Sequence, residues 1–195
     1  MENEVKEPAL KYGNISAEEY LMAERGVKER HELHHVQIVK LPGSSINHGR
    51  IVSHLLGNIG PYLKDTEYSI FITNLRLAIP SVPAFTYPDV SIVGGEPEML
   101  DEHLDNLTNP SVIIEVLSPQ TEQYDRGNKF FYYIKIESLK EYIMISSTSY
   151  YVQIARKQED DSWKFEEITD LNSTLQINTI QFKLDLSAIY ERVKF

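Results

Sequence analysis

One stretch decides the fold, NPSVIIEVLSP at residues 109–119. Its centre is a run of mostly β-branched apolar residues interrupted by a single carboxylate, Glu115. Near-continuous apolar runs are typical of strands that are covered on both faces of a sheet. Burying an ionised carboxylate there is costly unless a positive group pairs with it. Glu115 therefore needs a partner, either a metal ion or a structural Arg or Lys.

A second carboxylate, Asp89, opens the strand-like run at residues 89–93. If the two strands pair, Asp89 and Glu115 converge on one point, and two converging carboxylates favour a hard cation. Mg²⁺ prefers oxygen ligands and keeps several waters, so two carboxylates and a backbone carbonyl, assigned here to Val116, would suffice. Mn²⁺ is the expected substitute. A retained water would be the nucleophile for phosphodiester hydrolysis.

Lys129 lies on the helix expected at residues 122–136, directly after the Glu115 strand. Its ammonium would orient the water or stabilise charge that develops on the phosphate. The alternative is an ordinary ion pair with Asp125, four residues earlier, on the helix surface. On spacing alone, the surface ion pair is the favoured interpretation of Lys129.

The surrounding pattern predicts one α/β domain over residues 15–195, preceded by a loose N-terminal arm at residues 1–14. Ser16 and Glu19 form a capping-box signature for the first helix. The fold class we expect is a mixed central β-sheet flanked by helices, with additional antiparallel C-terminal strands. Expected helices cover residues 17–25, 46–59 and 122–136, and expected strands cover 36–41, 68–79, 89–93, 111–117, 141–146, 150–157, 163–168 and 179–184.

Composition excludes several classes of function. The 195 residues carry a net charge of -10, which argues against a broad basic face that coats nucleic acid, so any DNA contact must be local. The chain has no cysteine, which excludes disulfides, thiol catalysis and cysteine-ligated zinc. No apolar stretch is long enough for a membrane span, and residues 1–14 lack the order of a signal peptide. We therefore expect a cytoplasmic protein without a membrane partner.

The motifs occur in an order that resembles a known family. They are Tyr87-Pro88-Asp89-Val90, the stretch at 109–119, Tyr124-Asp125-Arg126-Gly127 with Lys129 and Tyr133, and Glu141-Tyr142. This order closely resembles the Uma-type restriction endonuclease family of the PD-(D/E)XK superfamily, over about residues 16 to 190. The resemblance implies a restriction-endonuclease-like core, Asp89 and Glu115 as metal ligands, and Lys129 as the catalytic lysine. The usual lysine position, two residues after the acid, is Leu117 here, so the lysine has moved to the following helix.

The resemblance also implies two further site residues, Glu32 as an additional acid and His48 as a polar contributor. For His48, the alternative is a helix N-terminal residue that bonds to backbone. Two positions depart from the family: His35-Val36-Gln37 replaces an Asp-Gly-Glu stretch, and Asn74 stands where relatives often have Asp. The loss of these acids would weaken metal binding if they lay near the metal.

Two other patterns have ordinary explanations. His31, Glu32 and His35 match the H-E-x-x-H zinc motif, but β-favouring residues follow at once, so we interpret the match as chance. The aromatic run at residues 130–133 suggests base stacking, but four consecutive aromatics on a helix point in different directions. We expect at least two of them to pack in the core.

The sequence thus predicts a Mg²⁺-dependent endodeoxyribonuclease that hydrolyses DNA phosphodiester bonds. The alternative from another class is a catalytically silent binding or regulatory module with the same fold, because the chain is acidic and lacks the acids at Gln37 and Asn74. A possible homodimer would suit an enzyme that cuts two strands, although the sequence has no heptad seam.

Overall fold

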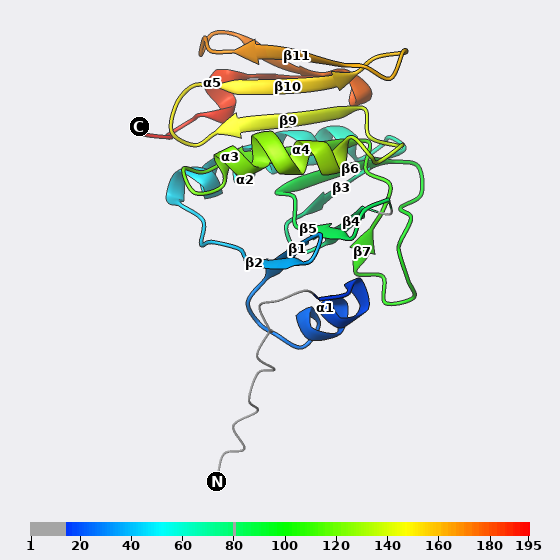
Figure 1. Cartoon of the computed structure of the whole chain (residues 1–195). Coiled ribbons are helices and arrows are strands. Elements are labelled where there is room, and N and C mark those ends of the chain that lie inside the picture. Colours follow the sequence, from blue (N-terminus) through cyan, green and yellow to red (C-terminus); the bar gives the residue numbers. More distant parts are fainter. Residues whose placement is uncertain (1–14, 80) are drawn as a thin grey trace.

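The computed structural model describes residues 15–79 and 81–195, so the arm expected at residues 1–14 lies outside the described residues. Its centre is a six-stranded sheet in which only the central pair, β8 and β9, runs parallel (Figure 1). The strands, in spatial order, are β11 (Trp163–Ile168), β10 (Val152–Lys157), β9 (Glu141–Ser146), β8 (Val112–Leu117), β6 (Val90–Gly94) and β3 (Tyr68–Ile72). The mixed sheet expected from the sequence is present.

A helical segment joins β8 to β9 and makes the predicted crossover between parallel strands. It consists of α3 (Glu122–Tyr124), the π-helical turn η1 (Asp125–Lys129) and α4 (Phe130–Tyr133). It ends three residues before the expected limit. Tyr132 and Tyr133 are buried and Phe131 is 63% exposed, so the aromatic run does pack at least two rings in the core.

The opposite face of the sheet is covered by α2 (Ile46–Leu63), which starts at the N-cap Ser45. Its four buried side chains recur every four residues, as expected for one helical face: Ile51, Leu55, Ile59 and Leu63. Side chains of β8 alternate between the two layers. Ile114 and Val116 pack in the core with α2, and Ile113 and Leu117 pack in the core with α4. Glu115 shares the face of Ile113 and therefore points toward the crossover helix.

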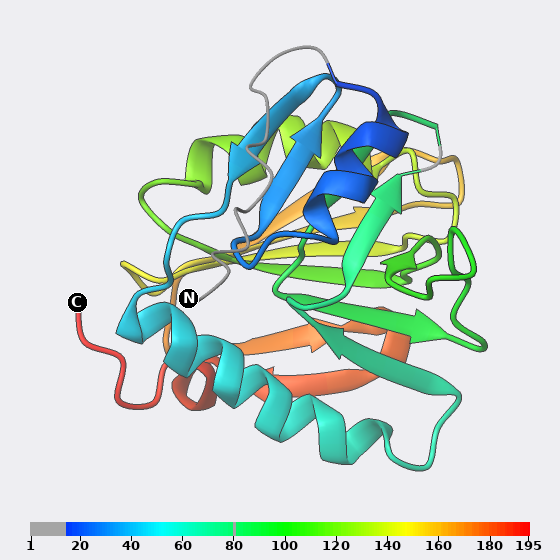
Figure 2. The same cartoon turned by 90° about the horizontal axis from the view of Figure 1, so that it is seen from below.

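A second, five-stranded sheet lies below the first and is covered by α1 (Ala17–Glu24) (Figures 1 and 2). In spatial order its strands are β2 (Gln37–Lys40), β1 (His31–His34), β5 (Ala84–Thr86), β4 (Arg76–Ile79) and β7 (Asn106–Leu107). The expected capping box of Ser16 and Glu19 starts α1.

The single strand expected at residues 68–79 is wrong. The structure divides it into β3 of the first sheet and β4 of the second. The N–H of Leu75 donates to the carbonyl of Ile72 at 3.0 Å and turns the chain between them. An apolar pattern that continues through a turn cannot reveal that two halves of a run belong to different sheets.

The C-terminal antiparallel strands are present, with one correction. The strand expected at residues 179–184 begins in a 3-10 turn, η2 (Asn178–Ile180), and the hairpin consists of β12 (Thr174–Ile177) and β13 (Phe182–Asp185). The short helix α5 (Leu186–Ile189) follows and packs against α2. In the described part of the chain, no helix combines the length and the apolar character needed to cross a membrane.

Candidate metal centre

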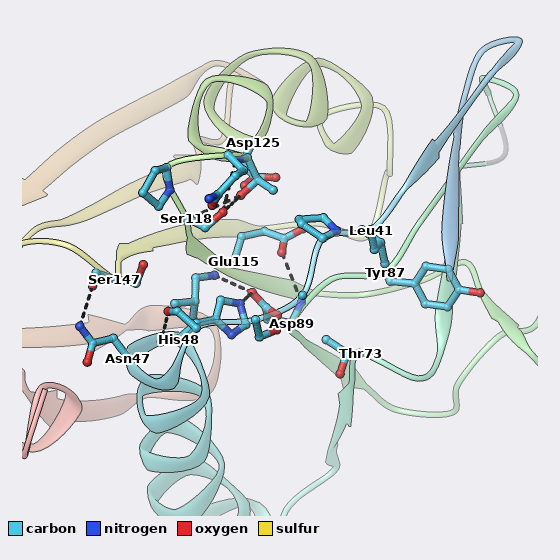
Figure 3. Close-up of a pocket in the computed structure, with 18 of the residues that line it drawn as sticks. Leu41, Asn47, His48, Thr73, Tyr87, Asp89, Glu115, Ser118, Asp125 and Ser147 are labelled. Carbon is cyan, nitrogen blue, oxygen red and sulfur yellow. Dashed lines mark hydrogen bonds and ion pairs between the residues drawn. The ribbon is translucent and has the colours of Figure 1, made fainter. Parts of the chain in front are cut away.

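A pocket of about 450 Å³ opens at the carboxyl end of β8 (Figure 3). It lies between the start of α2, the segment at residues 41–45 and the turn at residues 118–121. Asp89, Glu115 and Lys129 all line it, so the three residues predicted from separate segments meet at one place.

Strand pairing brings the two carboxylates together. Because Val90 of β6 pairs with Ile114 of β8, Asp89 comes to lie beside Glu115. The N–H of Val116 donates to Oδ2 of Asp89 at 2.8 Å, and the N–H of Asp89 donates to Oε2 of Glu115 at 3.3 Å. Each carboxylate is thus held by the backbone of the other strand.

His48 reaches the same place from α2. Its backbone N–H donates to the Ser45 hydroxyl at 3.1 Å, which is the helix-capping role that competed with a site role. Its ring is nevertheless turned toward the pocket, with Nε2 3.1 Å from Oδ2 of Asp89 (Figure 3). Ser45 is therefore the cap that accepts the His48 N–H, and the His48 side chain orients Asp89.

Lys129 is buried, although its helical spacing also suited the surface. Its Nζ lies 3.0 Å from Oε1 of Glu115, 3.1 Å from Oε1 of Glu32 and 3.2 Å from Oδ1 of Asp125. The i,i+4 pair with Asp125 does form, but inside the site and not on the helix surface. One ammonium therefore serves three buried carboxylates.

Glu32 comes from β1 of the second sheet and closes the far side of Lys129. Its Oε1 also accepts the N–H of Tyr87 at 2.9 Å, and its Oε2 lies 3.1 Å from Nε2 of His34. Glu32 does not line the pocket. The structure places it behind Lys129, where it holds the ammonium in position.

The cluster around Lys129 has more carboxylates than cations, and the pKa of Glu115 shifts accordingly. Burial, together with the negative charges of Asp125, Asp89 and Glu32, raises the pKa of Glu115 to about 8 despite the nearby Lys129. Burial also disfavours the charge of Glu32, but Lys129 and His34 outweigh it and hold the pKa of that carboxyl at about 2. The two acids share one lysine, but Glu32 also has His34 and the Tyr87 N–H as partners, whereas Asp125 and Asp89 add negative charge beside Glu115, so their pKa values shift in opposite directions.

Lys129 remains a cation in this environment. Burial disfavours its charge, but Glu115 and Glu32 raise the pKa of Lys129 well above its usual range. It can therefore stabilise negative charge, and it does not act as a base near neutral pH.

Sequence reasoning missed that Tyr133 donates from its hydroxyl to Oε1 of Glu115 at 2.9 Å. Its spacing was the available signal, because Tyr133 follows Lys129 by one helical turn.

The donor set fits a divalent cation that prefers oxygen. Excess negative charge at the pocket is what such an ion would neutralise, and carboxylates suit Mg²⁺ or Mn²⁺. Oδ1 of Asp89 accepts no hydrogen bond from the described residues and is available to a ligand. Among residues 15–79 and 81–195, no three His, Asp or Glu side chains form a ready metal group. A cation at Asp89 and Glu115 would need backbone and water oxygens as well, and the Val116 carbonyl stays the predicted third ligand.

The zinc motif has no structural counterpart. His31 to His34 form strand β1, not a helix, so His31 and His35 do not lie one helical turn apart as the motif requires. The His31 ring bonds Glu24 at 3.1 Å, and His35 is exposed in the turn that follows, with φ 59°. The doubt about a helix at this motif is confirmed, because the segment forms strand β1.

The two positions that depart from the family lie outside the pocket lining. Gln37 is exposed on β2. The side-chain oxygen of Asn74 is 3.4 Å from the guanidinium of Arg30, which also donates to the carbonyl of Thr73 at 2.7 Å. These departures therefore give no structural reason to regard the site as lost.

Comparisons with known proteins agree with this architecture. Residues 17–188 match the model of the Uma2 family, described as "Putative restriction endonuclease". Two uncharacterized proteins of Synechocystis sp. are similar: sll1609 is 32% identical, covering 84% of this chain and 93% of its own, and slr1290 is 30% identical, covering 96% and 97%. A crystal structure from Anabaena variabilis, described as "a putative nuclease belonging to DUF820", superimposes with a TM-score of 0.76 at 18% identity, covering 92% of this chain and 99% of its own. That likeness establishes the fold.

Proposed function

Because the chain belongs to the Uma2 family of restriction-endonuclease-like proteins, we propose that it is an endonuclease that hydrolyses DNA phosphodiester bonds with Mg²⁺, or with Mn²⁺ in its place. One observation carries the proposal: Asp89 and Glu115, from neighbouring strands, meet in a pocket beside the buried ammonium of Lys129. In metal-assisted hydrolysis of a phosphodiester, carboxylates can hold the ion that activates the water, and a fixed cation can stabilise charge on the phosphate.

Asp89, Glu115 and the Val116 carbonyl would hold the ion, which when bound supplies an activated water and a counter-charge for the phosphate. His48 orients Asp89 from α2, and Tyr133 fixes Oε1 of Glu115 from α4. These contacts restrict the rotation of both carboxylates before any ligand arrives, which is the preorganisation that a catalytic site needs.

Lys129 would stabilise the negative charge that builds on the phosphate oxygens. Its raised pKa keeps it protonated, and its contacts with Glu32 and Asp125 hold Nζ within 3.2 Å of three carboxylates. Glu32 thus acts through Lys129 as a positioning residue. A fixed cation of this kind needs no reorganisation as the reaction proceeds, which makes its contribution larger than that of a mobile surface lysine.

The test is cleavage of supercoiled plasmid and of DNA oligonucleotides with Mg²⁺, with Mn²⁺ and with EDTA. Wild type is compared with Glu115→Gln and with the matched control Glu159→Gln, which changes an exposed carboxylate in the β10–β11 turn. We expect wild type and Glu159→Gln to cut only with metal, and Glu115→Gln not to cut. Equal cleavage by all three proteins would show that the site is elsewhere or that a contaminant cuts.

A further inference from the structure

The segment at residues 192–195, called the rim below, does not line the pocket but is hydrogen-bonded to a residue that does. The side-chain amide of Asn47 donates to the carbonyl of Lys194 at 2.7 Å and to that of Ser147 at 3.4 Å. Asn47 and Ser147 both line the pocket (Figure 3). One turn further along α2, the Arg50 guanidinium donates to the carbonyl of Arg192 at 2.7 Å. The rim is therefore fixed to the helix that supplies His48.

Two exposed aromatic rings lie on this rim. Tyr150 is 39% exposed and Phe195 is 57% exposed, and their ring centroids are 4.9 Å apart in an edge arrangement. The buried ring of Tyr190 supports both, at 5.2 Å from Tyr150 and 5.9 Å from Phe195. The Tyr190 hydroxyl donates to the carbonyl of Tyr151 at 2.9 Å, which anchors the support. The aromatic pair is thus held from beneath while part of its surface faces solvent.

Two cations lie at the rim, beside the exposed Arg192–Glu191 pair. Within the described residues, neither Arg50 nor Lys194 forms an ion pair with a carboxylate. Asp101 and Asp105, which precede β7, pair with Arg25.

We propose that Tyr150, Phe195, Arg50 and Lys194 bind single-stranded nucleic acid next to the pocket. An unpaired base stacks on the aromatic pair, and the two cations contact the phosphates of the strand that continues to Asp89 and Glu115. Bases in a duplex are already paired and stacked, so their faces are not available to such a platform. Two cations also suit a short single strand better than a long duplex face. The inference rests on the proposed function for the reaction, but it names the form of the substrate.

Binding is measured separately from cleavage, by fluorescence anisotropy in EDTA. The probes are a labelled oligonucleotide of about 16 nucleotides as single-stranded DNA, as single-stranded RNA of the same sequence, and as duplex DNA. The variants are Phe195→Ala and Lys194→Glu. Their matched controls are Phe165→Ala, an exposed aromatic on β11, and Lys183→Glu, an exposed lysine on β13.

We expect wild type to bind the single strands more tightly than the duplex. Phe195→Ala should weaken single-strand binding about 5- to 150-fold, which corresponds to the loss of about 1–3 kcal/mol of stacking. Lys194→Glu should weaken binding and flatten its salt dependence, with both controls within about twofold of wild type. Comparison of the DNA and RNA probes shows which strand the rim prefers.

Duplex bound as tightly as single strands, or rim variants that behave like their controls, would overturn the inference. The proposed function fails in a different way. Single-strand binding that depends on Phe195 and Lys194, without cleavage under any metal condition, would support the binding site at the rim and contradict the proposed nuclease activity. Metal-dependent cleavage that is lost in Glu115→Gln but unaffected in Phe195→Ala and Lys194→Glu would support the proposed nuclease activity and contradict the binding site at the rim.

Discussion

Two buried glutamates on neighbouring parallel strands, Glu115 of β8 and Glu141 of β9, have opposite surroundings. Oε1 of Glu141 accepts the Arg156 guanidinium at 2.8 Å and the N–H of Asn178 at 3.1 Å, and its Oε2 accepts the N–H of Thr179 at 2.8 Å. Glu115 shares a single lysine with two other acids and lies next to Asp89. Both carboxylates are nearly inaccessible to solvent, at 4% for Glu115 and 2% for Glu141.

The difference separates a carboxylate that holds the fold together from one that is prepared for a ligand. Glu141 ties β9, β10 and the turn before β13 together, and its charge is matched by the protein itself. Glu115 lies at a pocket, and the protein leaves its charge under-compensated. Burial alone therefore does not identify a site; the balance of charge around the buried group does.

The largest expected effect is on stability, at Glu141. Glu141→Gln removes the buried partner of Arg156 and leaves it only the exposed Glu166, and breaking a buried pair costs up to about 3–5 kcal/mol. Glu115→Gln should change the free energy of unfolding by less than about 1 kcal/mol, or increase it, because one of several crowded negative charges disappears. Urea unfolding of both variants near neutral pH measures the contrast. An equal decrease in the free energy of unfolding of the two variants would mean that Glu115 and Glu141 stabilise the fold in the same way.

Lys129→Met is expected to have the next largest effect, on cleavage. Removing a preorganised group that stabilises transition-state charge lowers the rate about 100- to 1000-fold. Lys129→Met also lowers stability, because three buried carboxylates lose their shared ammonium, but the folded variant should still bind metal, since the lysine is not a ligand. Single-turnover cleavage and a separate metal titration measure the two properties. The matched control is Lys135→Met, which removes an exposed lysine later in the same segment and should leave the rate unchanged. A rate for Lys129→Met close to that of the control would exclude the proposed role.

The pH dependence of stability should sharpen the contrast further. The pKa of Glu115 in the folded, metal-free protein, about 8, exceeds the ordinary value of 4.5. The folded state therefore binds the proton more tightly, and this contribution to stability is complete below about pH 4 and is lost as pH rises to about 8. Glu115→Gln cannot titrate at this position, so it does not lose this stability as the pH rises. Its stability relative to wild type should increase between pH 5 and 8, by at most about 1.4 kcal/mol per pH unit.

Urea unfolding in EDTA across this interval measures that difference. A stability difference independent of pH would mean that Glu115 is ionised throughout, with its charge fully compensated in the same way as that of Glu141.

The smallest effect is expected at Asn74, where relatives often have Asp. Asn74→Asp places a carboxylate near the exposed Arg30 and outside the pocket lining, so the change in stability should be less than about 0.5 kcal/mol. Cleavage should stay within about twofold of wild type. A large gain in activity would mean that this position does reach the metal and that the family's acid there matters.

Much of the central sheet could be predicted because its signal is local. The apolar run of β8 and the helix that follows it indicate a buried strand and a crossover, and the crossover requires β9 to be parallel. The meeting of Asp89 and Glu115 followed from one assumption, that their strands pair, and the structure confirms it.

The remaining features depend on tertiary contacts that periodicity does not encode. The spacing of Asp125 and Lys129 is the same whether their helix face is exposed or buried, so the sequence could not show one ammonium among three carboxylates. The pairing of β1 with β5, which brings Glu32 behind Lys129, joins residues about 50 positions apart through short strands with little pattern of their own. The role of Glu141 was hidden for the same reason, since its partners come from β10 and η2.

The central claim is that Asp89 and Glu115 bind a divalent cation. Calorimetric titration of Mn²⁺ into wild type, Asp89→Asn, Glu115→Gln and the control Glu159→Gln tests it directly. We predict saturable binding to wild type and to Glu159→Gln, and binding weakened beyond detection in Asp89→Asn and Glu115→Gln. Wild-type affinity in those two variants, in proteins that remain folded, would contradict the account.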